Sequence, residues 1–286
     1  MRIFIPMDVI TRFAPSPTGN LHLGHAFSAL FAEREARTGN GKFLVRIEDI
    51  DTARCNSAFE ASIFEDLSWL RLTWEKPVRK QSNHMADYAK GLKKLENLGL
   101  LYRCTLSRKE LSEVMSAPHP DNALNSTQKT PTDTLRYISA IENERRLGAG
   151  APYAIRLHMG AALKLAGNLK WYDCEHGEQT AVPETFGDIV LARKDIATSY
   201  HLSVTIDDAI QGITRVTRGN DLLPATHIHR LLQELLELPT PDYHHHKMIT
   251  DKNGLRLAKR NKSSTLQEMK KSGQNPEDII QFLGFK

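Results

Sequence analysis

The chain has 286 residues, 40% of them hydrophobic and 25% charged, with a formal net charge of +4 at pH 7. This composition is that of an ordinary soluble globular protein of one or two domains, and no segment is low-complexity or visibly repeated. From three widely spaced cysteines we expect no disulfide framework, the first eight residues are too short and interrupted for a signal peptide, and no apolar run reaches membrane-spanning length. We therefore expect a cytoplasmic protein without a membrane segment, whose mildly basic charge permits a polyanionic partner.

The first predicted unit is a strand, a turn and a helix near the N-terminus. Val9 to Phe13 suit a short buried strand, a turn rich in proline and glycine ends it, and an alanine-rich helix begins near Leu21 and stops at Gly39. A second strand follows at 43–47. The order predicts a β-α-β unit with parallel strands.

His22 and His25 stand in the first turn of this helix, where an N-terminus attracts phosphate. They project from one face, and Gly24 between them leaves room for a flat ring close to the backbone. Two imidazoles can hydrogen-bond phosphate oxygens that gain charge during phosphoryl transfer, so the pattern favours a nucleoside triphosphate. The alternative is a pair of capping or core histidines. A zinc site is not expected, because no third ligand follows at helical spacing.

The second strand ends in an acidic run that includes Glu48, Asp49 and Asp51. If the strands are parallel, these carboxylates lie at the same sheet edge as the histidines, where they could bind an ammonium group, a ribose or a magnesium ion. The alternative is a solvated strand end.

Two core helices are expected next, one with an apolar stripe from Phe59 to Leu70 and one capped by Ser82. From about Tyr102 to Lys194 the pattern is less regular. We interpret 102–194 as an inserted subdomain that separates the first half of a catalytic domain, 1–101, from its second half, 195–286.

The second half is predicted to contain a strand over 213–221, in which Arg218 meets a turn. An arginine there can form a two-pronged ion pair with a carboxylate, or alternatively a surface salt bridge. An amphipathic helix is expected from Thr226 to Leu238, and the consecutive histidines 244–246 are expected in a loop rather than in a metal cluster.

Two segments carry a resemblance to a known family. Residues 12–19, R-F-A-P-S-P-T-G, followed by residues 22–25, H-L-G-H, resemble the first signature of class I aminoacyl-tRNA synthetases in the form used by glutamyl-tRNA synthetases. The resemblance covers nearly the whole chain. It implies an α/β fold, a Rossmann-like parallel-sheet catalytic domain with an inserted subdomain of the type that binds the acceptor end of tRNA.

The same resemblance implies roles for individual residues. Glutamate would be bound by Arg12, Ala14, Ser16, Glu48, Tyr200 and Arg218. Glu48 matches the residue that contacts the substrate amino group, and Ala14 would act through its backbone. ATP would be bound by Thr18, His22, Gly24, His25, Arg256 and Lys259. Of these, His22, His25 and Lys259 would act in the chemical step, with Mg²⁺ as cofactor.

Residues 255–260, L-R-L-A-K-R, resemble the second class I signature, a mobile Lys-x-Ser-Lys loop that neutralises the ATP phosphates. Arg256 replaces the first lysine and keeps its charge, while Lys259 preserves the second. Ala258 replaces the serine and removes a hydroxyl, from which we expect a lower rate.

The zinc site that many members of the family carry is not expected here, nor is any other metal site in the protein. Cys104 is present, but Leu106 stands where the second cysteine would be, and no Tyr-x-x-x-Cys follows. A structural zinc site needs about four ligands. Cys174 and His176 form a lesser candidate pair.

Only residues 261–286 follow the second signature, where a glutamyl-tRNA synthetase carries a large anticodon-binding region. The chain therefore resembles the shorter glutamyl-Q tRNA(Asp) branch of the family, to which Val204 and the R-G-N-D-L run at 218–222 also point. Members of that branch activate L-glutamate with ATP without tRNA and transfer it to the queuosine base at the wobble position of tRNA(Asp). We expect such an enzyme, without an anticodon-binding domain and monomeric.

Three alternatives stay open. A truncated glutamyl- or glutaminyl-tRNA synthetase would charge the 3′ end of its tRNA. A nucleotidyltransferase with the same His-x-Gly-His helix would use another acceptor, but it would have no reason to keep Arg12, Glu48, Tyr200 and Arg218. A catalytically silent paralogue would bind tRNA or a partner protein without turnover.

Overall fold

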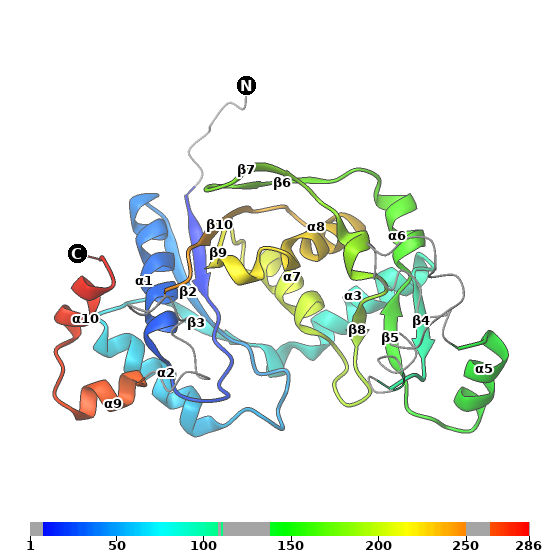
Figure 1. Cartoon of the computed structure of the whole chain (residues 1–286), viewed down its shortest axis with the longest axis horizontal. Helices are drawn as coiled ribbons and strands as arrows, with labels where there is room; N and C mark the ends of the chain where they lie inside the picture. The colour runs from blue at the N-terminus through cyan, green and yellow to red at the C-terminus, as the bar shows by residue number, and fades with distance from the viewer. Residues whose placement is uncertain (1–7, 108–109, 111–137, 250–263, 286) are drawn as a thin grey trace, which may run out of the picture.

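The computed structural model describes residues 8–107, 110, 138–249 and 264–285. Its first sheet is parallel in the order β1-β2-β3, formed by Ile10–Phe13, Lys42–Ile47 and Glu75–Lys80. Helix α1 (Leu23–Thr38) joins β1 to β2, and α2 (Ser57–Trp69) lies between β2 and β3 (Figure 1). The predicted β-α-β unit and the apolar stripe on α2 are thus confirmed.

Glycine is required in the turn that precedes β2. A side chain at Gly41 would overlap the main-chain carbonyl of Val9, so only glycine lets the chain pass this closely. The amide of Lys42 then donates to the same carbonyl at 3.2 Å, which starts the pairing of β1 with β2.

The hydrophobic core of this sheet is completed from the far end of the chain. Helices α9 (Leu266–Lys271) and α10 (Pro276–Phe282) lie beside α1 and α2 (Figure 1). Leu266 and Phe285 are buried in the same cluster as Ala29 and Ile63. The amide of Leu266 donates to the carbonyl of Leu21 at 2.9 Å, so this segment also touches the turn that precedes α1.

A second sheet has the order β7-β6-β10-β9, formed by Gly177–Thr180, Lys170–Asp173, Asp242–His246 and Arg215–Gly219. Strand β10 runs parallel to both β6 and β9, and β6 and β7 form an antiparallel hairpin. Helix α8 (Ala225–Leu236) connects β9 to β10. The amide of Thr214 donates to Ile10 at 3.1 Å, which places β9 beside β1.

The structure confirms the predicted strand around Arg218 and the amphipathic helix after it, but it corrects the prediction for the three histidines. His244, His245 and His246 do not form a loop; they belong to β10, between β6 and β9. Each imidazole has a side-chain or main-chain hydrogen-bonding partner. These hydrogen bonds offset the free-energy cost of burying polar rings, so a strand with few apolar residues can lie inside the sheet.

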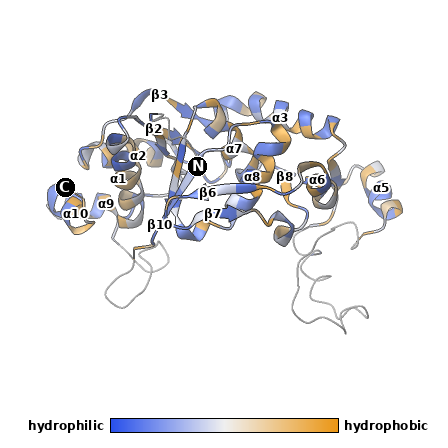
Figure 2. Cartoon of the chain, turned by 90° about the horizontal axis from the view of Figure 1, so that it is seen from above, coloured by the Kyte–Doolittle hydropathy of each residue, from blue (hydrophilic) through white to orange (hydrophobic). Residues whose placement is uncertain are grey.

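A third, antiparallel sheet has the order β4-β5-β8, formed by Leu101–Cys104, Ala154–Leu157 and Val190–Ala192. Next to it lie α5 (Ala140–Gly148), α6 (Met159–Ala166), α3 (Met85–Asn97) and α7 (Tyr200–Ile210). Figure 2 shows apolar residues on α3, α6 and α8, which share one buried cluster with α7. Residues 102–194 contribute β5, β6, β7 and β8 to two sheets, and their treatment as a separate subdomain remains a prediction.

The predicted cap of the helix that starts at Met85 is wrong. Ser82 lies in a short 3-10 turn, η1 (Gln81–His84), and His84 occupies the cap position without a side-chain bond. Ser82 instead donates from its hydroxyl to Asp49 at 2.7 Å and from its amide at 2.8 Å. The Asp49 carboxylate is buried and needs donors, and this need takes precedence over capping. None of the helices described is long and apolar enough to cross a bilayer.

Candidate active site

A cavity of about 710 Å³ opens where the carboxyl ends of β1, β2 and β9 meet the start of α1. It brings together ten of the twelve residues that the sequence singled out for glutamate and ATP. They are Arg12, Ala14, Ser16, Thr18, His22, Gly24, His25, Glu48, Tyr200 and Arg218. The other two, Arg256 and Lys259, lie outside the described residues. The roles of all twelve residues remain predictions, but ten of these residues line the same cavity and could contact the same bound substrates.

Arg12 is held from both sides by other groups of the protein. Its Nε and Nη2 atoms donate to the two carboxylate oxygens of Asp208 at 2.9 and 3.2 Å, and Nη1 donates to the carbonyl of Thr217 at 3.1 Å. Arg46, which is fully buried, donates to the same Asp208 at 2.8 Å. Burial opposes ionisation of Asp208, but Arg12 and Arg46 outweigh it and lower its pKa. Most of the hydrogen-bonding capacity of Arg12 is therefore used within the protein.

Glu48 closes the cavity at the end of β2. One carboxylate oxygen accepts from Arg46 Nη2 at 3.1 Å, and the main-chain amide of Glu48 donates to the carbonyl of Pro15 at 3.0 Å, tying β2 to the turn after β1. Burial raises the pKa of Glu48, while Arg46 and Arg12 oppose the rise. A second cation at this carboxylate, such as a substrate ammonium group, would favour its ionised form.

Arg218 occupies the cavity wall at the end of β9 and is buried, with 6% of its surface exposed. Its Nε donates to His245 Nε2 at 3.1 Å, Nη1 lies 3.1 Å from His229 Nδ1, and Nη2 donates to Thr226 Oγ1 at 2.6 Å. All three partners are uncharged groups or weak bases. Within the described chain no carboxylate forms an ion pair with this guanidinium, which distinguishes Arg218 from Arg12.

Burial, reinforced by Arg218, keeps the nearby histidines neutral. It lowers the pKa of His201 to about 4 and holds the pKa of His229 well below its ordinary value. Tyr200, at the start of α7, packs edge-on against both rings at centroid distances of 5.5 and 5.7 Å. The side chains that Arg218 contacts are therefore uncharged, which leaves its charge unneutralised by them and favours attraction of an anion.

His22 and His25 stack at the N-terminus of α1, with ring centroids 3.8 Å apart. His22 Nδ1 accepts from the amide of Gly24 at 3.1 Å, and His25 Nδ1 accepts from the amide of His22 at 3.3 Å, which forms a capping box. Because both Nδ1 atoms accept, the proton of each neutral ring is on Nε2. The pair therefore caps the helix, as the alternative interpretation held, and also supplies Nε2–H donors.

Arg256, Ala258 and Lys259 of the second signature lie outside the described residues, but the chain on either side of them borders the cavity. Met248 and Ile249 line it directly. Thr265 forms an isolated bridge with His22. On one side of the segment the described chain therefore lies at the cavity wall, and on the other side it pairs with His22.

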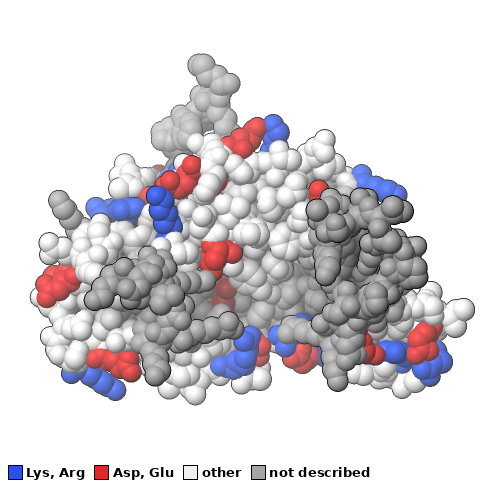
Figure 3. Space-filling model, in the orientation of Figure 1, with Lys and Arg blue, Asp and Glu red and all other residues white. Residues whose placement is uncertain are grey.

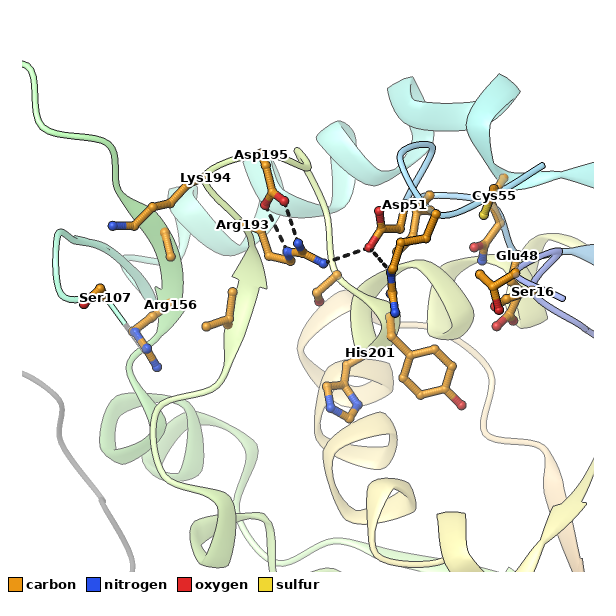
Figure 4. A pocket seen from close by; sticks show the side chains of 18 of the residues that line it. Ser16, Glu48, Asp51, Cys55, Ser107, Arg156, Arg193, Lys194, Asp195 and His201 are labelled. Carbon is orange, nitrogen blue, oxygen red and sulfur yellow. Dashed lines mark hydrogen bonds and ion pairs between the residues drawn. The ribbon is translucent and has the colours of Figure 1, made fainter. Parts of the chain in front are cut away.

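A second cavity of about 730 Å³ adjoins the first and shares Ser16, Thr18, Glu48 and Tyr200 with it. Figure 4 shows Arg193 at its rim, between Asp195 and Asp51. The Arg193 guanidinium lies 3.3 Å from Asp51, which also accepts from Arg54 at 2.8 Å. This cavity lies between the first sheet and the β4-β5-β8 sheet, and both signs of charge line it.

Two carboxylates, Glu48 and Asp221, line the first cavity, and Glu48 is already paired with Arg46. Such a set fits a magnesium ion carried largely by nucleotide phosphates and water, not by a protein cage. The described residues contain no cluster of three or more potential metal ligands. Of the lesser zinc pair, His176 Nδ1 lies 2.7 Å from a carboxylate oxygen of Asp173, and Cys174 is a free thiol.

Sequence reasoning missed two histidines that contact Arg218 and the aspartate that contacts one of them. His229, His245 and Asp173 come from α8, β10 and β6, and none belongs to a signature. Their only sequence signal is the unusual density of histidines around 244–246.

Surface charge gives little further guidance. On the face shown in Figure 3, groups of both signs lie around the upper and lower edges, and much of the described middle is uncharged. On this face the described residues therefore form no continuous basic patch of the kind that binds nucleic acid.

Comparison with known proteins assigns the fold. The family model for tRNA synthetases class I (E and Q), catalytic domain, matches residues 8–285. The chain is 44% identical over 283 residues to a glutamyl-Q tRNA(Asp) synthetase of Rhodobacter capsulatus, covering 96% of this chain and 100% of that protein. It is 36% identical to a glutamyl-Q tRNA(Asp) synthetase of Nocardia farcinica, covering 95% of this chain and 82% of the other.

Among solved structures, the chain resembles the glutamate-tRNA synthetase of Elizabethkingia anophelis with a TM-score of 0.79 and 25% identity. The match covers 97% of this chain but 61% of that one. The chain thus spans about three fifths of the solved synthetase and the full length of the Rhodobacter relative.

Proposed function

The chain belongs to the class I tRNA synthetases for glutamate and glutamine, and we propose that it activates L-glutamate with ATP and transfers it to the queuosine base of tRNA(Asp). Activation is proposed to need no tRNA. The observation that carries this proposal is that one cavity joins a buried arginine lacking a carboxylate partner in the described chain, Arg218, to a helix N-terminus with two imidazoles. The names of the full-length relatives support the choice of acceptor.

The two ends of the cavity orient the amino acid. The reacting carboxylate of glutamate must face the nucleotide at His22 and His25, so its side-chain carboxylate would reach Arg218, and its ammonium group would lie at Glu48. Arg218 offers a planar guanidinium in a buried environment, where pairing with a carboxylate is strong and geometrically selective. Glutamine lacks this charge, and aspartate is one methylene shorter.

In the first step an oxygen of the glutamate carboxylate attacks the α-phosphorus of ATP. The new bond is acyl oxygen to phosphorus, and the bond to pyrophosphate breaks. His22 and His25 would donate from Nε2 to phosphate oxygens as charge builds, aided by the N-terminus of α1. A magnesium ion bound with the nucleotide would supply further charge neutralisation, and we propose that Arg256 and Lys259 do the same.

In the second step a hydroxyl of the queuosine ring attacks the acyl carbon, loses its proton, and AMP leaves. We propose that this hydroxyl arrives through the second cavity, which meets the first at Glu48 and Tyr200. The guanidinium of Arg193 at its rim suits a phosphate backbone, and its carboxylates can accept from sugar or base hydroxyls. No side-chain nucleophile is required.

The first test is exchange of labelled pyrophosphate into ATP without tRNA, run in parallel with glutamate, glutamine and aspartate. Exchange with glutamate alone is expected, and exchange that requires added tRNA would contradict tRNA-independent activation.

The acceptor is tested with labelled glutamate and three forms of tRNA(Asp): containing queuosine, lacking queuosine, and containing queuosine but without the 3′-terminal adenosine. Labelling of the first and third only is expected. Labelling of the first and second only, or labelling of a parallel sample of tRNA(Glu), would instead identify an enzyme that charges the 3′ end. No labelling of any of these tRNAs, combined with tRNA binding, would identify a silent paralogue.

A further inference from the structure

Behind Arg218, two side chains outside both cavities form a buried chain of hydrogen bonds. Asp173 of β6 lies 2.6 Å from His245 Nδ1 of β10, and His245 Nε2 accepts from Arg218 Nε of β9 at 3.1 Å. Asp173 is fully buried and His245 is 1% exposed. Three neighbouring strands therefore connect a carboxylate to the guanidinium through one imidazole.

We propose that Asp173 and His245 are positioning residues for glutamate recognition: Asp173 fixes the tautomer of His245 that accepts from Arg218, and His245 thereby orients the guanidinium toward the cavity. The inference rests on the proposed function, because it assigns the substrate carboxylate to Arg218. Neither residue lines the cavity, so both act through Arg218.

The contacts of Asp173 dictate the tautomer. Its two oxygens accept from the amides of Glu175, His176 and His245, at 3.0, 3.1 and 3.2 Å, in addition to the two imidazoles. Burial opposes ionisation of Asp173, but these bonds outweigh it and lower its pKa. An ionised carboxylate can only accept, so His245 must carry its proton on Nδ1. In the neutral ring, Nε2 is then the acceptor that Arg218 requires.

The same arrangement explains why Arg218 keeps its charge for a ligand. His245 accepts its Nε, and His229 Nδ1 lies 3.1 Å from its Nη1. Burial lowers the pKa of both histidines, so neither partner is a cation that would repel the guanidinium. Asp173 itself stays one imidazole away. A carboxylate in direct contact, as Arg12 has in Asp208, would instead compete with the substrate.

Two substitutions of His245 distinguish its hydrogen bond with Arg218 from its hydrogen bond with Asp173. In His245→Gln the side-chain oxygen can take the place of Nε2 and accept from Arg218, whereas in His245→Asn the amide nitrogen can take the place of Nδ1 and donate to Asp173 only. His245→Asn is expected to raise the KM for glutamate on the order of tenfold to a hundredfold, with the KM for ATP within twofold of wild type. His245→Gln is expected to stay within a few-fold of wild type for both substrates.

Equal KM values for glutamate in the two variants, or a parallel rise in the KM for ATP, would overturn the inference. The kinetics come from pyrophosphate exchange, and calorimetric titration with glutamate alone gives the same comparison without turnover. If wild type binds glutamate but does not exchange, and only His245→Asn binds weakly, the proposed function fails and the inference stands. If wild type neither exchanges nor binds glutamate, both fail.

Nitrogen-15 NMR of the imidazoles tests the tautomer in the wild-type protein, and a variant is needed only to assign the signals. The His245 signals, identified by their loss in His245→Gln, are expected to show a protonated Nδ1 and an unprotonated Nε2. A protonated Nε2, in either the other tautomer or the cation, would overturn the inference.

Discussion

Arg12 and Arg218 reach the same cavity from adjacent strands, but in the described chain only Arg12 forms an ion pair with a carboxylate. Arg12 is bound through both prongs to Asp208, while Arg218 donates to a threonine and lies against two neutral imidazoles. The two arginines therefore differ in what a substitution removes. One substitution breaks an internal ion pair, and the other removes a guanidinium whose contacts are with His245, His229 and Thr226.

Arg218→Ala is expected to raise the KM for glutamate by roughly a hundredfold or more, because it removes a charged, two-pronged contact from a buried site. The KM for ATP should change less than threefold. Arg218→Lys should recover only part of the affinity, since a lysine cannot copy the planar fork. Pyrophosphate exchange measures both constants, and an equal rise in both would contradict the assignment.

Arg12→Ala is expected to act mainly on stability. After this substitution the buried Asp208 is bound by Arg46 but no longer by Arg12. Removing one partner of a buried ion pair lowers the free energy of unfolding by on the order of 3 kcal/mol. Urea unfolding should therefore show a larger loss for Arg12→Ala than for Arg218→Ala. A smaller loss for Arg12→Ala would mean that its pairing with Asp208 contributes little to the fold.

His25→Asn tests whether His25 acts in the reaction besides capping. The asparagine side-chain oxygen can replace Nδ1 in accepting from the amide of His22, so the melting temperature should stay near that of wild type. Without the Nε2–H donor, the kcat of pyrophosphate exchange should fall by roughly a hundredfold or more, while glutamate binding measured by calorimetry is retained. Unchanged turnover would leave His25 with the capping role alone.

Arg193→Gln should separate the two steps of the reaction. The change weakens the rim of the second cavity, where Arg193 bridges Asp51 and Asp195, and leaves the first cavity intact. Pyrophosphate exchange should be unchanged, while the KM for tRNA in the transfer step rises several-fold.

The matched control for Arg193→Gln is Arg54→Gln, which removes the other arginine bound to Asp51. Arg54 is mostly exposed, and it should have the smaller effect because an exposed ion pair contributes little. Loss of exchange in Arg193→Gln would show that the two cavities are not independent.

Asp66 on α2 is expected to make stability depend on pH. It is fully buried, accepts from Gln267 of α9 at 2.7 Å, and burial raises its pKa to about 6. An acid whose pKa is higher in the folded than in the unfolded state binds extra protons when folded. The free energy of unfolding therefore falls as the pH rises from about 4 to 6, and the loss persists above that range.

Asp66→Asn keeps the acceptor for Gln267 and removes the charge. At pH 8 it should stabilise the protein on the order of 1 to 3 kcal/mol, and the gain should shrink as the pH is lowered to 4.5. Urea unfolding at both pH values measures the difference. A gain that is the same at both would show that titration of Asp66 is not its source.

The residues grouped at the first cavity were predictable because they lie in short, local motifs. The signature around His22 and His25 contains its own strand, turn and helix start, so its residues lie close together in the sequence as well as in the fold. Arg218 was also predictable as the end of a strand that meets a turn.

The hydrogen bonds that hold such residues in place were not predictable, because each one depends on a partner that is distant in sequence. Ser82 has the sequence of a helix cap, and only the approach of the buried Asp49 redirects it. The histidines of β10 look like a polar loop, since nothing local reveals that β6 will bring Asp173 beside His245 across 72 residues. Burial of polar groups in pairs leaves no periodic signal in either partner.

The core of the first sheet has a consequence for how the protein is made. Its apolar cluster combines residues 13–72 with residues 266–285, and the turn before α1 bonds to Leu266. During synthesis, the strand and helix that carry His22 and His25 emerge first but lack one wall of their core until the segment of α9 and α10 has left the ribosome. The turn and helix start that hold His22 and His25 are therefore complete only after residues 266–285 have been synthesised and have packed against them.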